Sequence, residues 1–245
     1  MSNQTRTVIV TGASKGIGAQ LAKQLASDGF QTIVNYSASA DEAKEVVASI
    51  EKAGGRAKAI AADVADASAM RTLFDRAEAE FGPVDVLVNN AGILKNSPLS
   101  EVTDEDYQRQ IAVNLTGTFN GMREGAKRVR DGGRIINFST SIIGNYLPTY
   151  GVYAATKAAV EAMTHILAKE LGSRKVTVNA VAPGPVATEL FLKGKSDELI
   201  QRLTKDIPLG RLGEPDDIAL VVSFLASPNS GWINGQVIKV NGGRN

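Results

Sequence analysis

The sequence predicts an α/β fold in which a doubly wound, parallel, seven-stranded sheet carries helices on both faces, as a single domain over residues 1–245. Three observations support this. Short apolar runs alternate with amphipathic helical patterns along the chain. A glycine-rich turn joins the first apolar run to the first helical pattern. No linker, repeat or low-complexity segment marks a boundary between domains.

Seven segments are interpreted as buried parallel strands because they are short and apolar. They cover residues 7–11, 31–36, 57–61, 84–88, 134–138, 176–182 and 236–240. Helices are predicted between them, over residues 17–28, 41–52, 67–81, from 103 onward, 153–171 and 215–225. Thr103 is a good N-cap, and Gly29 and Gly172 stand where helices should end. Right-handed crossovers between such strands produce a parallel sheet.

The composition excludes several kinds of chemistry. The 245-residue chain has no cysteine, so disulfides and thiolate catalysis are excluded, and His165 is its only histidine. Zinc sites of the usual His/Cys kind cannot be built, and we expect no metal. The net charge of +1 does not suggest nucleic-acid binding. No apolar run is long enough to span a bilayer or to serve as an export signal, so we expect no membrane contact and a cytoplasmic protein.

The turn after the first strand has the features of a dinucleotide site. Its glycines are Gly12, Gly16 and Gly18. Glycine lets the backbone approach a pyrophosphate, and the N-terminus of the next helix offers free N–H groups and the positive end of a dipole. The alternative is a tight turn with glycine for geometry alone. The strand before it and the helix after it favour the dinucleotide site.

Tyr153 and Lys157 stand four positions apart at the start of a long helical pattern. This spacing places both side chains on one face of the helix. A cation near a phenol lowers the pKa of the phenol from about 10, which suits general acid–base chemistry. Such pairs are also common as solvated pairs on helix surfaces, so the meaning of this pair depends on its surroundings.

Three motifs together resemble those of the short-chain dehydrogenase/reductase family. They are Thr11-Gly12-x-x-x-Gly16-Ile17-Gly18, Asn89-Asn90-Ala91-Gly92 after the fourth strand, and Tyr153-x-x-x-Lys157. The glycine spacing is one residue longer than the Gly-x-Gly-x-x-Gly fingerprint. The resemblance extends over essentially the whole chain and implies a Rossmann fold.

The resemblance implies a dinucleotide held by residues from several strand ends. They are Gly12, Ser14, Lys15, Gly16, Ile17 and Gly18; Asn35, Tyr36 and Ser37; Asp63 and Val64; Asn90, Ala91 and Gly92; Tyr153 and Lys157; and Pro183, Gly184, Val186 and Thr188. Rossmann units that bind NAD carry an acid at the end of the second strand, and residues 35–37 contain none. A carboxylate there would repel a 2′-phosphate, and Lys15 can reach the same place unless it is merely solvated. We therefore expect NADPH/NADP+.

The resemblance also implies a catalytic set. Tyr153 donates a proton, Lys157 lowers the pKa of that tyrosine and holds the nicotinamide ribose, and Asn114 bends its helix and supports a proton relay. A hydroxyl at the end of the fifth strand polarises the carbonyl. One count of the spacing indicates Thr140 and another indicates Ser141, so both stay open.

We expect an NADPH-dependent carbonyl reductase that transfers hydride between NADP(H) and a small-molecule ketone or secondary alcohol, beneath a lid over about residues 189–212. One alternative is a 3-oxoacyl-[acyl-carrier-protein] reductase with a basic rim formed by Arg128, Arg130 and Arg174. The other is a non-catalytic dinucleotide sensor. The resemblance further implies a homodimer or homotetramer, assembled through the Asn114 helix and the alanine-rich helix that begins at Tyr153.

Overall fold

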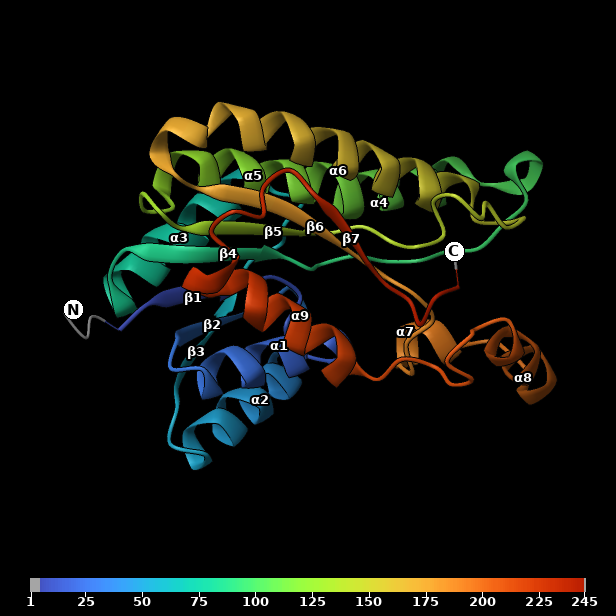
Figure 1. Ribbon diagram of the computed structural model, residues 1–245, viewed down its shortest axis with the longest axis horizontal. Helices are drawn as coiled ribbons and strands as arrows, with labels where there is room; N and C mark the ends of the chain where they lie inside the picture. The colour runs from blue at the N-terminus through green and yellow to red at the C-terminus, as the bar shows by residue number, and fades with distance from the viewer. Residues whose placement is uncertain (1–4, 245) are drawn as a thin grey trace.

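One parallel sheet with the strand order β3-β2-β1-β4-β5-β6-β7 organises the computed structural model, which describes residues 5–244 (Figure 1). The strands are β1 (Thr7–Val10), β2 (Gln31–Tyr36), β3 (Arg56–Ala61), β4 (Val84–Asn89), β5 (Arg134–Phe138), β6 (Thr177–Pro183) and β7 (Val237–Val240). Every neighbouring pair is parallel. The predicted α/β fold is confirmed, because the alternation of apolar strands and helices forces parallel crossovers.

Helices cover both faces of this sheet. They are α1 (Gly16–Ser27), α2 (Ala40–Lys52), α3 (Ala67–Phe81), α4 (Asp104–Gln110), α5 (Gly117–Arg128), α6 (Gly151–Glu170), α7 (Glu189–Leu192), α8 (Asp197–Lys205) and α9 (Pro215–Ala226). Local capping fixes several of their starts. The Asp66 carboxylate accepts hydrogen bonds from the first backbone N–H groups of α3, and the Thr103 hydroxyl does the same for α4.

Alternate residues of the central strands pack into two separate hydrophobic cores, one on each face of the sheet. Val8 and Val10 point to the face covered by α1, α2 and α9, whereas Ile9 points to the face covered by α3, α5 and α6. Figure 1 shows these two layers on opposite sides of the sheet. All three side chains are fully buried. Burial on both faces explains why the strands appear in the sequence as continuous apolar runs.

The long helix predicted from Thr103 is interrupted in the structure. Between α4 and α5 the backbone forms a π-helical segment, Ile111–Thr116, with Asn114 fully buried inside it. Gly117 follows because a Cβ there would overlap the Val64 side chain at 2.6 Å. The helix therefore passes close to the end of β3, and the π-helical segment places Asn114 in the interior.

The strand order reverses between β1 and β4, and this places a crevice outside the carboxyl ends of these strands. Loops from every later strand end reach the same edge. In the part of the chain that the structure describes, no helix has the length and hydrophobicity needed to cross a membrane.

Candidate active site

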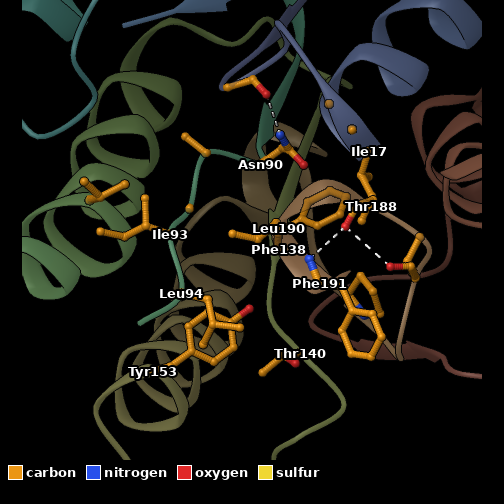
Figure 2. A pocket seen from close by; sticks show the side chains of 18 of the residues that line it. Ile17, Asn90, Ile93, Leu94, Phe138, Thr140, Tyr153, Thr188, Leu190 and Phe191 are labelled. Atoms are coloured by element: carbon orange, nitrogen blue, oxygen red, sulfur yellow. Dashed lines mark hydrogen bonds between the residues drawn. The ribbon is translucent and has the colours of Figure 1, made fainter. Parts of the chain in front are cut away.

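A cavity of about 420 Å³ lies along the carboxyl edge of the sheet. Every residue predicted for the cofactor lines it, and so do Thr140, Ser141, Tyr153 and Lys157. Asn114 does not line it. Figure 2 shows Tyr153, Ile93 and Leu94 on one side of this space and Thr188 and Phe191 on the other. Residues from strand ends far apart in the sequence thus meet around one cavity.

The glycine turn is built so tightly that two of its glycines cannot be replaced without movement. A Cβ on Gly12, whose φ is +61°, would lie 2.9 Å from the Ala91 Cα, and one on Gly18 would overlap the Gly12 carbonyl oxygen. Asn90 closes the turn from β4, because its side-chain amide donates to the Thr11 and Gly12 carbonyl oxygens. No side chain caps the start of α1, so its first N–H groups are left for an anion.

Asn35 has a structural role that differs from the predicted contact with a cofactor. The residue is 1% exposed, and its side-chain amide donates to the Ile60 and Ala62 carbonyl oxygens at 3.2 and 3.1 Å. Its side-chain oxygen accepts a hydrogen bond from the Gly12 N–H. Asn35 therefore ties the ends of β2 and β3 to the glycine turn. Ser37, two residues later, is exposed at the cavity edge.

Lys15 projects from the glycine turn toward residues 189–212, the segment that the sequence predicts as a lid. Its ammonium lies 3.2 Å from the Glu189 carboxylate, and both side chains are more than half exposed. The lid begins at Glu189, which is the first residue of α7. Lys15 is thus more than a solvated loop lysine, although an exposed ion pair of this kind contributes only about 0–1 kcal/mol.

The lid has well-defined ends. Backbone hydrogen bonds join Ala187 N–H to the Gly213 carbonyl and Gly213 N–H to the Pro185 carbonyl. Residues 189–212 therefore leave and rejoin the body of the protein at one place. Within this segment α7 and α8 present Leu190, Phe191 and Leu203 to the cavity. This arrangement gives the lid an apolar inner face.

The two hydroxyl residues after β5 differ in environment. Thr140 hydrogen-bonds through its side chain with Tyr153, and Figure 2 shows the two residues facing the same space. Ser141 is 5% exposed, and its backbone N–H donates to the Pro183 carbonyl oxygen at 2.9 Å. Thr140 therefore lies near the tyrosine hydroxyl. Ser141 lines the same cavity, and its backbone is anchored to the end of β6.

Lys157 is held below Tyr153 by the end of β5. Its ammonium donates to the Phe138 carbonyl oxygen at 2.8 Å and lies 5.9 Å from the centre of the Tyr153 ring. Burial lowers the pKa of Lys157 to about 8. Burial also raises the pKa of Tyr153 to about 12, and the hydrogen bond with Thr140 acts in the opposite direction. The one-turn spacing predicts a lowered tyrosine pKa, whereas burial of the phenol raises it in this structure.

Asn114 lies behind this group of residues. Its side-chain oxygen accepts from the Ile93 N–H at 2.8 Å, and its amide donates to the Ile93 carbonyl oxygen at 2.9 Å. A Cβ on Gly92 would lie 3.3 Å from the Asn114 side-chain oxygen and 3.5 Å from the Lys157 ammonium. Asn114 and Lys157 are therefore close neighbours, and Asn114 fixes the loop that forms one wall of the cavity.

Several residues at or near this site were not predicted, among them Ser139, Glu161 and Arg244. Ser139 donates from its hydroxyl to the Glu161 carboxylate at 2.5 Å, which anchors the loop after β5 to α6. The periodicity of α6 places Glu161 one turn beyond Lys157 and could have indicated this contact. Arg244 lines the cavity from the turn after β7. Only its position after the last predicted strand could have suggested that contact.

Comparison with known proteins gives consistent matches over the whole chain. A family model described as enoyl-(acyl carrier protein) reductase matches residues 12–245. A short-chain type dehydrogenase/reductase of Picea abies is 46% identical, over 98% of this chain and 92% of that protein. NADPH-dependent aldehyde reductase 2, chloroplastic, of Arabidopsis thaliana is 47% identical, over 97% of this chain and 93% of that protein. The crystal structure of a short chain dehydrogenase from Burkholderia cenocepacia J2315 in complex with NADP superimposes with a TM-score of 0.93 at 37% identity, covering 99% and 98% of the two chains.

Proposed function

This chain belongs to the short-chain dehydrogenase/reductase family, and we propose on that basis that it is an NADPH-dependent carbonyl reductase. It transfers hydride between NADP(H) and a ketone or aldehyde on one side and the corresponding alcohol on the other. The observation that carries the proposal is the position of Tyr153. Its hydroxyl meets Thr140 at the same cavity whose far end is the glycine turn.

The glycine turn suits the pyrophosphate of a dinucleotide. Gly12 and Gly18 leave no room for a Cβ, and the uncapped N–H groups of α1 face the cavity. Exposed Ser37 and the nearby Lys15 suit a 2′-phosphate better than two free hydroxyls, because residues 35–37 bring no carboxylate. The relative from Arabidopsis is named NADPH-dependent, which agrees with this choice. When bound, the nicotinamide supplies or accepts the hydride.

In the direction of reduction, Tyr153 gives its proton to the carbonyl oxygen as that oxygen gains electrons. The raised pKa of Tyr153 keeps the proton on the phenol at neutral pH. The Thr140 hydroxyl donates a hydrogen bond to the same oxygen and stabilises its developing charge. Lys157, held by the Phe138 carbonyl, places a cation beside the phenolate that remains. Asn114 positions the wall that carries Ile93.

An acyl-carrier-protein reductase is the second candidate, favoured by the description of the matching family model. The structure does not support the basic rim predicted for a carrier. Arg128, Arg130 and Arg174 are ion-paired to neighbouring carboxylates. They also lie at or just beyond the ends of α5 and α6, at the amino edge of the sheet and opposite the cavity. A carrier protein could not reach Tyr153 from these arginines.

We also propose that the protein is a homodimer or homotetramer. Ala155, Ala158 and Ala162 form an exposed stripe along α6, and Phe119 on α5 is 45% exposed. A face of small side chains lets a second helix approach closely, and burying it removes apolar surface from water. A cytoplasmic location stays a prediction from the sequence.

Replacement of Tyr153 tests the proposed function. Tyr153→Phe keeps the ring and removes the proton, so NADPH binding and the fold should survive while reduction falls by at least about 100-fold. The measurement is the loss of NADPH absorbance with activated aldehydes and ketones, together with the Kd of NADPH by fluorescence titration. Near-full activity in the folded variant contradicts the mechanism, and a native protein that binds NADPH without reducing any carbonyl supports the sensor.

A further inference from the structure

Arg244 is a buried cation that the proposed reaction does not use. Its side chain is 9% exposed and lines the cavity. The buried Nε has no hydrogen-bond partner among the described residues. Within residues 5–244, the acid paired with the guanidinium is Asp206, whose carboxylate lies 4.0 Å away and is 59% exposed. Apart from this weak and solvent-facing ion pair, no acid among the described residues pairs with the Arg244 guanidinium, and the residue lines the cavity, so its charge can take a further anionic partner there.

The backbone fixes Arg244 at the end of the cavity away from the glycine turn. Strand β7 pairs with β6, and the Gly184 N–H donates to the Val240 carbonyl oxygen. The Gly242 carbonyl accepts from the Leu209 N–H at the base of the lid. In the strand order, β7 lies two strands beyond β5, which carries the Lys157 contact, and four beyond β1. Arg244 therefore belongs to the substrate end rather than to the dinucleotide turn.

The acids that line the cavity are already engaged elsewhere. Asp63 accepts a hydrogen bond from the Ala65 N–H after β3, and Glu189 pairs with Lys15. Among the described lining residues, the two carboxylates therefore have partners other than Arg244. An anionic ligand would be attracted here, because charges interact more strongly where water is excluded.

Several apolar side chains line the cavity that Tyr153 and Arg244 share. Leu147, Leu190, Phe191 and Leu203 line the same cavity, together with the Tyr150 ring. Figure 2 shows Leu190 and Phe191 facing the space in front of Tyr153. A ligand that spans this surface needs a hydrocarbon spacer between its carbonyl group and its charged end.

We propose that Arg244 binds a carboxylate on the substrate, so that this enzyme reduces oxo acids in which an apolar spacer separates the carbonyl from the carboxylate. The inference rests on the proposed carbonyl reductase activity and names its substrate class. The planar guanidinium pairs with the carboxylate through its N–H donors. The carbonyl carbon gains a hydride from NADPH and the carbonyl oxygen gains the Tyr153 proton, which gives an alcohol and NADP+. The carboxylate stays unchanged.

Matched pairs of acid and ester test this inference. The probes are 3- and 4-formylbenzoate and 5-oxohexanoate, each beside its methyl ester, with NADPH as the reductant. We expect kcat/KM to be about 10- to 100-fold higher for the preferred acid than for its ester. Arg244→Met should abolish this preference by lowering only the rate with the acid, and Arg244→Lys should keep part of it. Arg76→Met, which removes an exposed arginine on α3, should keep all of it.

Binding measurements separate this inference from the proposed function. Calorimetry with 4-(hydroxymethyl)benzoate in the presence of NADP+ should show binding that is lost in Arg244→Met, while the Kd of NADPH stays unchanged. Equal kcat/KM for acid and ester in the native enzyme overturns the inference, and so does an Arg244→Met variant that keeps the preference or loses affinity for NADPH. If no carbonyl is reduced but the carboxylate still binds through Arg244, the anion site stands and the reductase proposal fails.

Discussion

At the scale of single residues, we expect Thr140 and its neighbour Ser141 to contribute differently to catalysis. Thr140 faces the Tyr153 hydroxyl, whereas Ser141 is buried and its backbone N–H is bound to the end of β6. We predict that Thr140→Val lowers kcat by about 10²–10³-fold, because an oxyanion donor is lost. Ser141→Ala should lose less than about 10-fold. Steady-state kinetics of the two folded variants compare them directly, and the reverse order of losses would assign the role to Ser141.

The pKa values of the catalytic pair predict a particular pH profile. Lys157 should lose its charge as pH rises through about 8, while Tyr153, with a pKa of about 12, keeps its proton. We therefore expect kcat/KM for reduction to fall above pH 8. A profile that stays flat to pH 10 would contradict the assignment of Lys157.

Protein stability provides the control for this profile. The pKa of Lys157 is about 8 in the folded protein, against 10.5 for an ordinary solvated lysine, so the unfolded chain binds more protons between these values. The contribution of Lys157 to the free energy of unfolding therefore rises with pH across this window. Urea unfolding at each pH distinguishes a loss of catalysis from a loss of structure.

At the scale of elements, two positions at the end of β2 have different roles. Asn35 is a buried amide that joins strands, whereas Ser37 is exposed at the cavity edge. Ser37→Asp should lower the preference for NADPH over NADH by roughly 10-fold or more, because a carboxylate repels the 2′-phosphate. The measurement is the ratio of kcat/KM values for the two coenzymes. Unchanged preference would place the phosphate away from Ser37.

Asn35→Asp is the matched comparison two residues earlier. A carboxylate cannot donate to the Ile60 and Ala62 carbonyl oxygens as the amide does. We expect the free energy of unfolding to fall by about 1–3 kcal/mol, because buried acceptors lose their donor. Chemical denaturation measures this. A variant as stable as the native protein would show that the amide does not hold these strands together.

At the scale of the whole molecule, the exposed stripe on α6 predicts assembly. Light scattering after size-exclusion chromatography should show a dimer or tetramer. Ala158→Arg should raise the dissociation constant by at least about 100-fold, because it buries an unpaired charge and a bulky side chain in a close helix contact. Ala53→Arg, at the exposed end of α2, should leave assembly unchanged. A native monomer at micromolar concentration would contradict the proposed interface.

Sequence patterns alone predict the parallel sheet, the strand bounds to within one residue and the position of the cavity at the carboxyl ends of the strands. These depend on local signals. Continuous apolar runs predict buried parallel strands, and Gly12 and Gly18 mark backbone that must pack without a Cβ. Tyr153 and Lys157 share a helix face through spacing alone.

Which side chains line the cavity, and which are buried away from it, depends on tertiary contacts that the sequence patterns do not show. The Asn35 side chain is buried and joins two strands, and the Thr140 side chain lies near Tyr153. Desolvation then raised the tyrosine pKa against the expectation from its neighbour in sequence. Arg244 lines the cavity because β7 pairs with β6 and the turn after it contacts the base of the lid. Such contacts join residues far apart in the chain, and their geometry depends on strand register and packing rather than on local sequence.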